Sequence, residues 1–494
     1  MSHLKEFKEN YGLIKNYIDG EWVESKGEPR DIYNPAKDEV IGQVPMSPQS
    51  EIDDAVAAAK EAYQDWRETP PISRARRMFK LKEIMEKRFE DFARVLVQEM
   101  GKHIDESRGE IRRAIENVET ACAVTTMQKG YCLEDGASAG IDEDAVKVPL
   151  GPFACLAPYN FPGMIPYWFW PYAVATGNTY ILKPSSQVPL TQQVMTEAID
   201  EAGFPPGVFN LVNGSHDLAD ALMMHPDVKG ISFVGSTPIA HHVYKLSSEY
   251  KKRVQAQGGA KNTIVVMQDC NRKRSLANMI ASFFGCTGQR CLAGANLLIL
   301  GDESFYQEFK EEFIKMAKGI KLGYGLDESS GMGPLVSKKA QKKVVEYIDI
   351  GEKEGGKLLL DGRGAKAEGY ENGYFVGPTI FEDVQPDHTI AQEEIFGPVV
   401  SLMRMSDLDE AIEFMNSSPF GNAASIYTSS GPAARKFRYE VESGNIGINI
   451  GIVAAMAYFP FAGMKDSFFG DLHGQGQDAI DFFTDRKVVI TRWL

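Results

Sequence analysis

Short apolar strands that alternate with helices are the feature that most constrains the fold of this chain. The runs at 208–212 and 230–234 are each followed by a turn rich in Gly, Ser or Asn and then by a helical pattern, and the run at 179–182 ends at Lys183-Pro184. Strands joined through helices form parallel sheets, because a parallel neighbour is reached only by a crossover connection. The sequence therefore predicts an α/β fold.

The residues that follow these three strands are expected at one edge of a single sheet, where ligands bind in open α/β folds. Lys183 would meet a ribose or a phosphate there, unless it is a solvated surface lysine. Gly235 and Ser236 precede a helix with Pro238 near its start. The backbone N–H groups of such a helix start suit a pyrophosphate, although the segment lacks the usual spacing of dinucleotide-binding glycines.

Other segments extend this picture to a second domain. A chain of 494 residues exceeds one ordinary domain, and the strand–helix pattern restarts after residue 254. The predicted elements are a hairpin with an Asp-Gly turn at 14–23, helices at 50–66, 72–98 and 105–129, and strands at 146–156, 263–267 and 295–300.

Charge and cysteine content exclude several classes of protein. The formal net charge of -15 argues against nucleic acid or an anionic membrane as a partner. Six irregularly spaced cysteines form no disulfide framework, and without a His/Cys cluster no metal site is expected. The apolar stretch at 161–175 is short and interrupted by three prolines, and the N-terminus is polar, so a soluble cytoplasmic protein is expected.

Cys291 is the candidate nucleophile. It follows Gly288, which permits close backbone approach, and Arg290, whose charge would favour the thiolate. The alternative is a small buried core cysteine.

Two further segments hold candidate site residues. Asn160 lies in the proline-framed loop 157–162, where its amide would stabilise an oxyanion or else cap a turn. Glu394 and Phe396 precede a Gly-Pro turn and would hold a nicotinamide ribose or merely cap a loop.

In this order the segments resemble the aldehyde dehydrogenase superfamily, from about residue 14 to residue 493. The matching segments are 157–162 (APYNFP), 177–184 (GNTYILKP), 206–212 (PGVFNLV), 233–236 (FVGS), 288–291 (GQRC) and 393–398 (EEIFGP). The resemblance implies two α/β domains with a small β oligomerisation arm, and a homo-oligomer, either a dimer or a tetramer. It places the dinucleotide-binding domain at 1–129 and 145–254, the catalytic domain at 255–445, and the arm with the C-terminal segment at 130–144 and 446–494.

The resemblance also implies a role for each site residue. Cys291 is the nucleophile, and Asn160 donates to the oxyanion together with the Cys291 backbone N–H. NAD or NADP is the implied cofactor, and its contacts are Lys183, Ser186, Gly235, Ser236, Glu394 and Phe396.

Position 257 distinguishes subfamilies. Hydrolytic members carry a glutamate there that activates water, whereas this chain has Gln257, which is no general base at neutral pH. The segments at 257–262, 288–291 and 459–473 resemble CoA-acylating methylmalonate-semialdehyde dehydrogenases, so CoA is the implied acyl acceptor. Arg113 and Arg290 match the two arginines that hold the substrate carboxylate in that family. For Arg113 the alternative is an ion pair within its helix, with Glu110 or Glu116 as partner, and Arg290 would otherwise tune the thiol.

The chain departs from the family at three places. Ser186 stands where many NAD-dependent members carry a glutamate, which leaves room for the 2′-phosphate of NADP. Tyr159 replaces a common Trp, and the loop 448–456 lacks the prolines usual in the methylmalonate-semialdehyde group. Two rivals therefore stay open: a hydrolytic NADP-dependent dehydrogenase of glyceraldehyde 3-phosphate or another small aldehyde, and a non-catalytic structural protein on the same fold.

Overall fold

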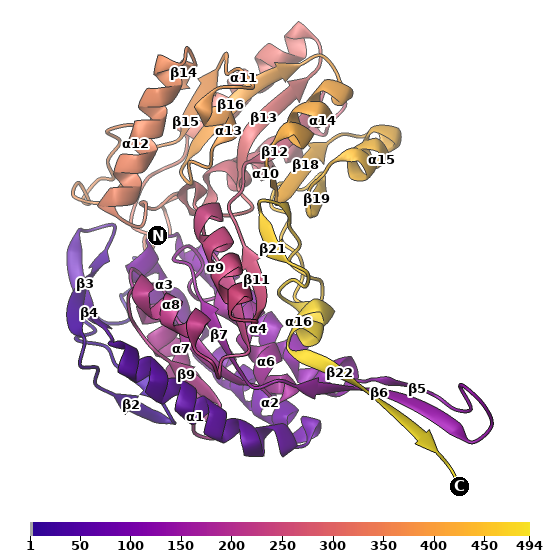
Figure 1. The fold of residues 1–494 in the computed structure, drawn as a ribbon. Coiled ribbons are helices and arrows are strands. Elements are labelled where there is room, and N and C mark those ends of the chain that lie inside the picture. The colour runs from indigo at the N-terminus through magenta and orange to yellow at the C-terminus, as the bar shows by residue number, and fades with distance from the viewer. Residues whose placement is uncertain (1–2) are drawn as a thin grey trace.

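The computed structural model describes residues 3–494 as two open sheets covered by helices and one protruding arm (Figure 1). The first sheet has eight strands, in the spatial order β2 (Glu21–Val23), β1 (Asn16–Ile18), β9 (Phe209–Leu211), β8 (Thr179–Lys183), β7 (Pro152–Leu156), β10 (Gly230–Val234), β11 (Arg253–Gln257) and β21 (Phe468–Gly470). The five strands from β9 to β11 are parallel, and the outer strands pair antiparallel.

Helices bury both faces of this sheet. Successive side chains of a strand point to opposite faces, so alternate residues of β7 belong to different cores. Phe153 and Cys155 of β7 pack in one core with α2 (Pro71–Lys87), α3 (Phe89–Met100), α4 (Ile104–Cys122), α6 (Trp170–Thr176) and α7 (Leu190–Ala202). Ala154 and Leu156 pack in another core with α1 (Gln49–Glu68), α8 (His216–Met224) and α9 (Thr237–Glu249).

The second sheet has seven strands and the same layered construction. Its spatial order is β14 (Lys357–Leu360), β15 (Thr379–Glu382), β16 (Val399–Met405), β13 (Gly294–Leu300), β12 (Asn262–Met267), β18 (Ala423–Tyr427) and β19 (Asn445–Ile448). One face packs on α10 (Arg272–Phe284) and α11 (Glu303–Lys318). The other packs on α12 (Lys338–Lys353), α13 (Thr389–Gln392), α14 (Leu408–Ser417) and α15 (Gly431–Glu440). The predicted α/β class is confirmed.

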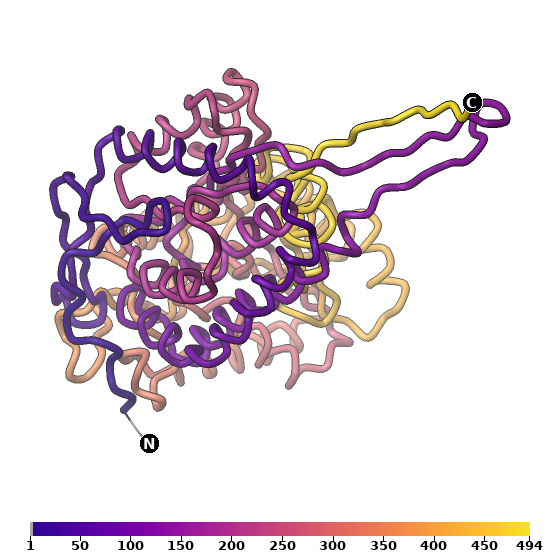
Figure 2. The backbone as a smooth tube through the Cα atoms, turned by 90° about the horizontal axis from the view of Figure 1, so that it is seen from below, coloured from indigo at the N-terminus to yellow at the C-terminus, as the bar shows by residue number. Residues whose placement is uncertain are grey.

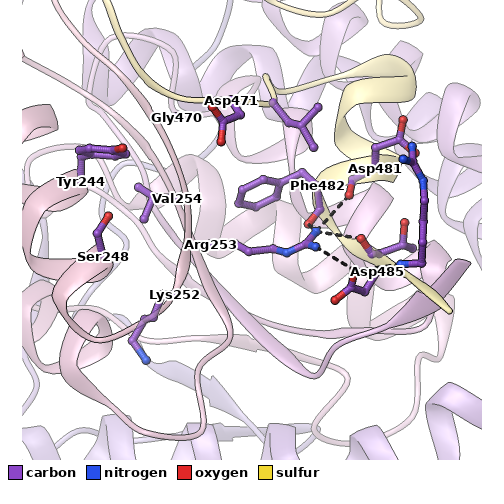
Figure 3. Close-up of a pocket in the computed structure, with 13 residues that line it drawn as sticks. Tyr244, Ser248, Lys252, Arg253, Val254, Gly470, Asp471, Asp481, Phe482 and Asp485 are labelled. Carbon is purple, nitrogen blue, oxygen red and sulfur yellow. Dashed lines mark hydrogen bonds and ion pairs between the residues drawn. The ribbon is translucent and has the colours of Figure 1, made fainter.

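A three-stranded antiparallel arm extends away from both sheets (Figures 1 and 2). Its strands are β22 (Thr484–Arg492), β6 (Ile141–Pro149) and β5 (Tyr131–Leu133). At its root, Arg253 of β11 donates from Nη1 to the carbonyls of Phe482 and Thr484, both at 2.8 Å, beside a cavity of about 550 Å³ (Figure 3). The arm is thereby fixed to the first sheet through α16 (Gly476–Phe482).

Several predicted elements are confirmed and three differ in extent. The hairpin of β1 and β2 turns at Asp19 and Gly20, both with positive φ. The region 72–98 contains two helices, α2 and α3, and the helix expected at 105–129 ends at Cys122, before the short α5 (Val124–Met127). The strand expected at 146–156 is two strands, β6 and β7, in different sheets.

The remaining short elements are β3 (Glu28–Asn34), β4 (Glu39–Met46), β17 (Phe420–Gly421), β20 (Met464–Lys465) and the 3-10 turns η1 (Ile165–Trp168) and η2 (Gly285–Gly288). Within residues 3–494, no helix is both long and apolar enough to cross a membrane.

Candidate active site

A cavity of about 820 Å³ brings three of the predicted site residues together. Cys291, Arg290 and Arg113 all line it, although they come from two distant parts of the chain. A much smaller cavity on the other side of Arg290, of about 20 Å³, is lined by Glu394 and Phe396. Lys183, Ser186, Gly235 and Ser236 line neither cavity and lie at the carboxyl edge of the first sheet.

The backbone before Cys291 makes a left-handed turn. After α10 ends, Cys286, Thr287 and Gly288 have φ values of 51°, 55° and 71°. A Cβ on Gly288 would lie 2.2 Å from the carbonyl oxygen of Gly397, so glycine is required there for packing between two protein segments. The close approach expected of Gly288 is therefore an approach to protein backbone.

Two asparagine side chains hold the backbone carbonyl of Cys291. The Cys291 carbonyl accepts hydrogen bonds from Nδ2 of Asn262 and Nδ2 of Asn422, each at 2.7 Å. Two buried amides thus fix the backbone from which the thiol projects. Neither asparagine was predicted as a site residue from the sequence, although Asn262 ends the segment 257–262 that carries part of the resemblance.

The electrostatic surroundings of the thiol differ from the prediction. Burial, and after it the Glu394 carboxylate, raises the pKa of the Cys291 thiol to about 12. The charge of Arg290 acts in the opposite direction, but its Nη2 lies 2.7 Å from Glu106 Oε1, which offsets that charge. Arg290 therefore favours the thiolate as expected, but burial and Glu394 act more strongly in the opposite direction.

Asn160 lies against the nucleophile segment. Its side chain is 4% exposed, and its Nδ2 donates to the carbonyl of Gln289 at 3.1 Å, two residues before Cys291. Its own carbonyl accepts from Lys102 Nζ at 2.8 Å. The amide therefore points to the loop that carries the thiol, which suits an oxyanion donor.

Both candidate substrate arginines have carboxylate partners of their own. Arg113 pairs with Glu116 at 3.0 Å and not with Glu110, and Arg290 pairs with Glu106 at 2.7 Å. The two guanidinium groups nevertheless line the same cavity. A substrate carboxylate in the cavity would share each arginine with its glutamate partner or displace that glutamate.

The sheet edge fits the pyrophosphate and ribose of a dinucleotide. β8, β9 and β10 are parallel strands of one sheet, so Lys183 and the Gly235-Ser236 turn meet at its carboxyl end. A Cβ on Gly235 would lie 2.4 Å from the Phe233 ring, and Ser236 makes no side-chain cap on α9. The free N–H groups of that helix start suit an anion.

Lys183 is buried rather than solvated. Burial lowers its pKa to about 8, and its Nζ donates to the carbonyl of Pro184 at 3.1 Å. A buried amine with one neutral partner retains donors for a ribose hydroxyl. The alternative of a surface lysine is excluded.

Glu394 and Phe396 line the small cavity that Arg290 also lines. Glu394 Oε1 accepts from the Ala260 N–H at 2.8 Å, and burial raises its pKa. Phe396 has a φ of 62°, which is rare for an aromatic residue, and its ring meets Tyr159 edge-on at 5.9 Å. Backbone strain of this kind persists where the surroundings impose it, often at functional sites.

Gln257 lies at the end of β11 and is 3% exposed. Its Nε2 donates to the carbonyl of Phe461 at 3.1 Å, and its Oε1 is buried without a hydrogen-bond partner in the described part of the chain. The side chain thus has a free acceptor but no carboxylate. Across residues 3–494, no group of three metal-binding side chains is found.

Comparisons with known proteins agree with this geometry. The aldehyde dehydrogenase family model matches residues 22–489. A malonate-semialdehyde dehydrogenase of Geobacillus kaustophilus is 45% identical over 481 residues, which cover 97% of this chain and 99% of the relative.

Solved structures give the same result. The methylmalonate-semialdehyde dehydrogenase of Oceanimonas doudoroffii superposes with a TM-score of 0.96 at 37% identity, covering 98% of this chain and 99% of the other. An NAD+ complex of an aldehyde dehydrogenase from Bacillus cereus superposes with a TM-score of 0.93 at 32% identity, covering 98% and 97%. The chain belongs to the aldehyde dehydrogenase family.

Proposed function

We propose that this chain oxidises malonate or methylmalonate semialdehyde with NAD or NADP and transfers the acyl group to CoA. The observation that carries the proposal is the cavity that Cys291 lines together with two arginines, Arg113 and Arg290. A planar guanidinium suits a carboxylate, and both named acids carry one beside the aldehyde. The names of the relatives support the same substrates.

Cys291 adds its thiol across the aldehyde C=O and forms a thiohemiacetal. Asn160 and the Cys291 backbone N–H donate to the oxygen as negative charge develops on it. Oxidation then leaves a thioester on Cys291. The thiol of CoA takes the acyl group and returns the Cys291 thiol, and with these two acids the family chemistry also releases carbon dioxide.

A nicotinamide dinucleotide, when bound, accepts the hydride. Lys183, Ser186 and the Gly235-Ser236 turn would hold its adenosine and pyrophosphate half. Glu394 and Phe396, which line the small cavity beside Arg290, would hold its nicotinamide half. Ser186 places no carboxylate near the adenosine ribose, so both NAD and NADP fit.

Gln257 supports CoA rather than water as the acyl acceptor. An amide cannot remove a proton from water at neutral pH, so the thioester lasts until a better nucleophile arrives. The free Gln257 Oε1 can accept a hydrogen bond from a water molecule but cannot take its proton.

The proposed domain division is residues 1–129 with 145–254, residues 255–445, and residues 130–144 with 446–494. Most strands of the first sheet fall in the first part and most strands of the second sheet in the second, whereas β21 of the first sheet belongs to the third part. The arm supports self-association to a dimer or tetramer. Tyr131, Leu133, Val488, Ile490 and Trp493 are exposed on it, and β22 has an unpaired edge. Light scattering of the purified protein measures the assembly.

Product analysis with malonate semialdehyde, with and without CoA, tests the function. Acetyl-CoA formed in the presence of CoA, with little free acid released in its absence, supports the proposal. Rapid CoA-independent release of free acid favours the hydrolytic rival. Cys291→Ala should abolish turnover and leave dinucleotide binding nearly intact. Turnover within about tenfold of the parent would remove the covalent role of Cys291.

A further inference from the structure

Helix α4 presents a polar stripe to the cavity beside Cys291. Glu106, Glu110, Arg113 and Asn117 follow one another at spacings of four, three and four residues, which places them on one helix face. All four line the cavity. A helix face that packs inward is normally apolar, so packing alone does not explain these four polar residues.

Glu110 holds the loop that contains Asn160. Its Oε1 accepts from the backbone N–H groups of Gly163 and Met164, at 2.7 and 3.1 Å. Its Oε2 lies 2.5 Å from Lys102 Nζ, which in turn donates to the Asn160 carbonyl at 2.8 Å. One carboxylate thus fixes the oxyanion loop at both ends.

The Lys102–Glu110 pair is fully buried, with both side chains 0% exposed. Lys102 Nζ also lies 3.8 Å from the centroid of the Phe161 ring. A buried ion pair adds little net stability, because desolvation of the charges offsets their attraction. The partners of this pair are concentrated at residues 160–164, so its effect is on the geometry of that loop.

Glu106, one turn earlier, holds the nucleophile segment. Its Oε1 accepts from the Cys286 N–H at 2.7 Å and from Arg290 Nη2 at 2.7 Å. Cys286 and Thr287 are both left-handed, a conformation that is unfavourable for residues with a Cβ. Such a turn persists only where other contacts hold it, and Glu106 holds both of its ends.

We propose that Glu106 and Glu110 are positioning residues, which act through Cys291 and Asn160 respectively. Because they lie one helical turn apart on α4, that helix sets the separation between the nucleophile and the oxyanion donor. The inference rests on the proposed roles of Cys291 and Asn160. Cys291→Ala and Asn160→Ala test those two roles independently of the positioning.

Glu110→Gln tests the oxyanion half. The rate of hydride transfer in a single turnover should fall by about 10²-fold, the effect of a small misplacement at a reacting centre. Dinucleotide affinity should not change. Glu119→Gln is the matched control, since Glu119 lies on the same helix but pairs with Lys82 and does not line the cavity.

A double-substitution cycle separates positioning from general damage. Asn160→Ala should lower hydride transfer by about 10²–10³, the usual loss for one oxyanion donor. If Glu110 acts through Asn160, adding Glu110→Gln to Asn160→Ala should cost less than about threefold more. An equal fold loss in both backgrounds overturns the proposal for Glu110.

Glu110→Gln leaves Lys102 buried without its counter-charge, so the variant can fail to fold. The double variant Lys102→Met with Glu110→Gln removes both charges and takes its place in the same cycle. It should show the same loss of hydride transfer in the parent and the same near-absence of further loss with Asn160→Ala. Full additivity overturns the proposal.

Glu106→Gln tests the nucleophile half with two readouts that move in opposite directions. Arg290 loses its counter-charge, so the thiolate is favoured and iodoacetamide should alkylate Cys291 faster at a fixed pH. Hydride transfer should become slower, because a neutral amide oxygen holds the Cys286 N–H and the Arg290 guanidinium more weakly than the carboxylate does. A change of both rates in the same direction, or of neither, overturns the role of Glu106.

Discussion

Arg290 Nη2 lies 2.7 Å from Glu106 Oε1, although 184 residues separate the two positions. The pairing weakens the effect that a cation directly before Cys291 has on the thiol. The charge of Arg290 is shared with a carboxylate, while burial and Glu394 raise the pKa of the thiol. Burial and the Glu394 carboxylate thus act against the thiolate, and Arg290 only partly offsets them.

The first prediction concerns pH. A thiol with a pKa of about 12 is protonated at neutral pH, so its thiolate fraction rises about tenfold per pH unit. The rate of Cys291 alkylation by iodoacetamide in the ligand-free protein should therefore rise continuously from pH 7 to 9. Mass spectrometry of the Cys291 peptide measures the rate, and a plateau below pH 8 would contradict the high pKa.

The second prediction concerns Arg113. Arg113→Met should reduce kcat/KM for malonate semialdehyde by about 10–100-fold, the effect of losing a hydrogen bond to a charged group. It should change kcat/KM for propanal, which has no carboxylate, by less than threefold.

Arg112→Met is the matched control for Arg113→Met. Arg112 is the next residue on α4, pairs with Glu86 at 2.7 Å and does not line the cavity. Equal losses for the two aldehydes in Arg113→Met would show that Arg113 does not contact the carboxylate.

The third prediction concerns the cofactor. Ser186→Glu should weaken NADP more than NAD, because a carboxylate at this edge repels a 2′-phosphate and accepts from ribose hydroxyls. Fluorescence titration with each dinucleotide measures the two affinities. Equal changes would place position 186 away from the ribose.

The fourth prediction concerns Gln257. Gln257→Glu should raise CoA-independent release of free acid by about 10²–10⁴, the contribution of a positioned general base. The parent should produce a burst of reduced dinucleotide without CoA and then a slow phase. If Gln257→Glu leaves that slow phase unchanged, position 257 does not face the thioester.

The parts of the fold that follow local signals could be predicted from the sequence. The Asp19-Gly20 pair needs positive φ at both positions and so identified the first hairpin. The turns after β8, β9 and β10 identified one sheet edge. Among the site residues, Cys291 was a candidate from its own segment and Arg113 was identified by resemblance, and the structure places both on one cavity.

Contacts between distant residues could not be predicted in this way. The separation of β6 from β7 is one case, because the N–H groups of Leu150 and Gly151 bond to the Asn178 side chain instead of continuing a strand. The contacts of Glu106 and Glu110 are a second case, because in the sequence both residues look like ordinary surface charges. The helical spacing of Glu106, Glu110, Arg113 and Asn117 on a half-buried helix was the available signal.

Two parts of the cavity wall differ in polarity, so rate and substrate size can be engineered at different positions. Along α4, the charged side chains Glu106 and Glu110 bond to the segments that carry Cys291 and Asn160. Substitutions there should therefore alter rate and specificity together. Another part of the wall consists of apolar side chains from the loop after β19, namely Ile450, Ile452, Ala454 and Ala455. These side chains carry no polar atom that the nucleophile or the oxyanion loop relies on. A library aimed at accepting bulkier aldehydes can therefore vary that wall and keep the reactive centre intact.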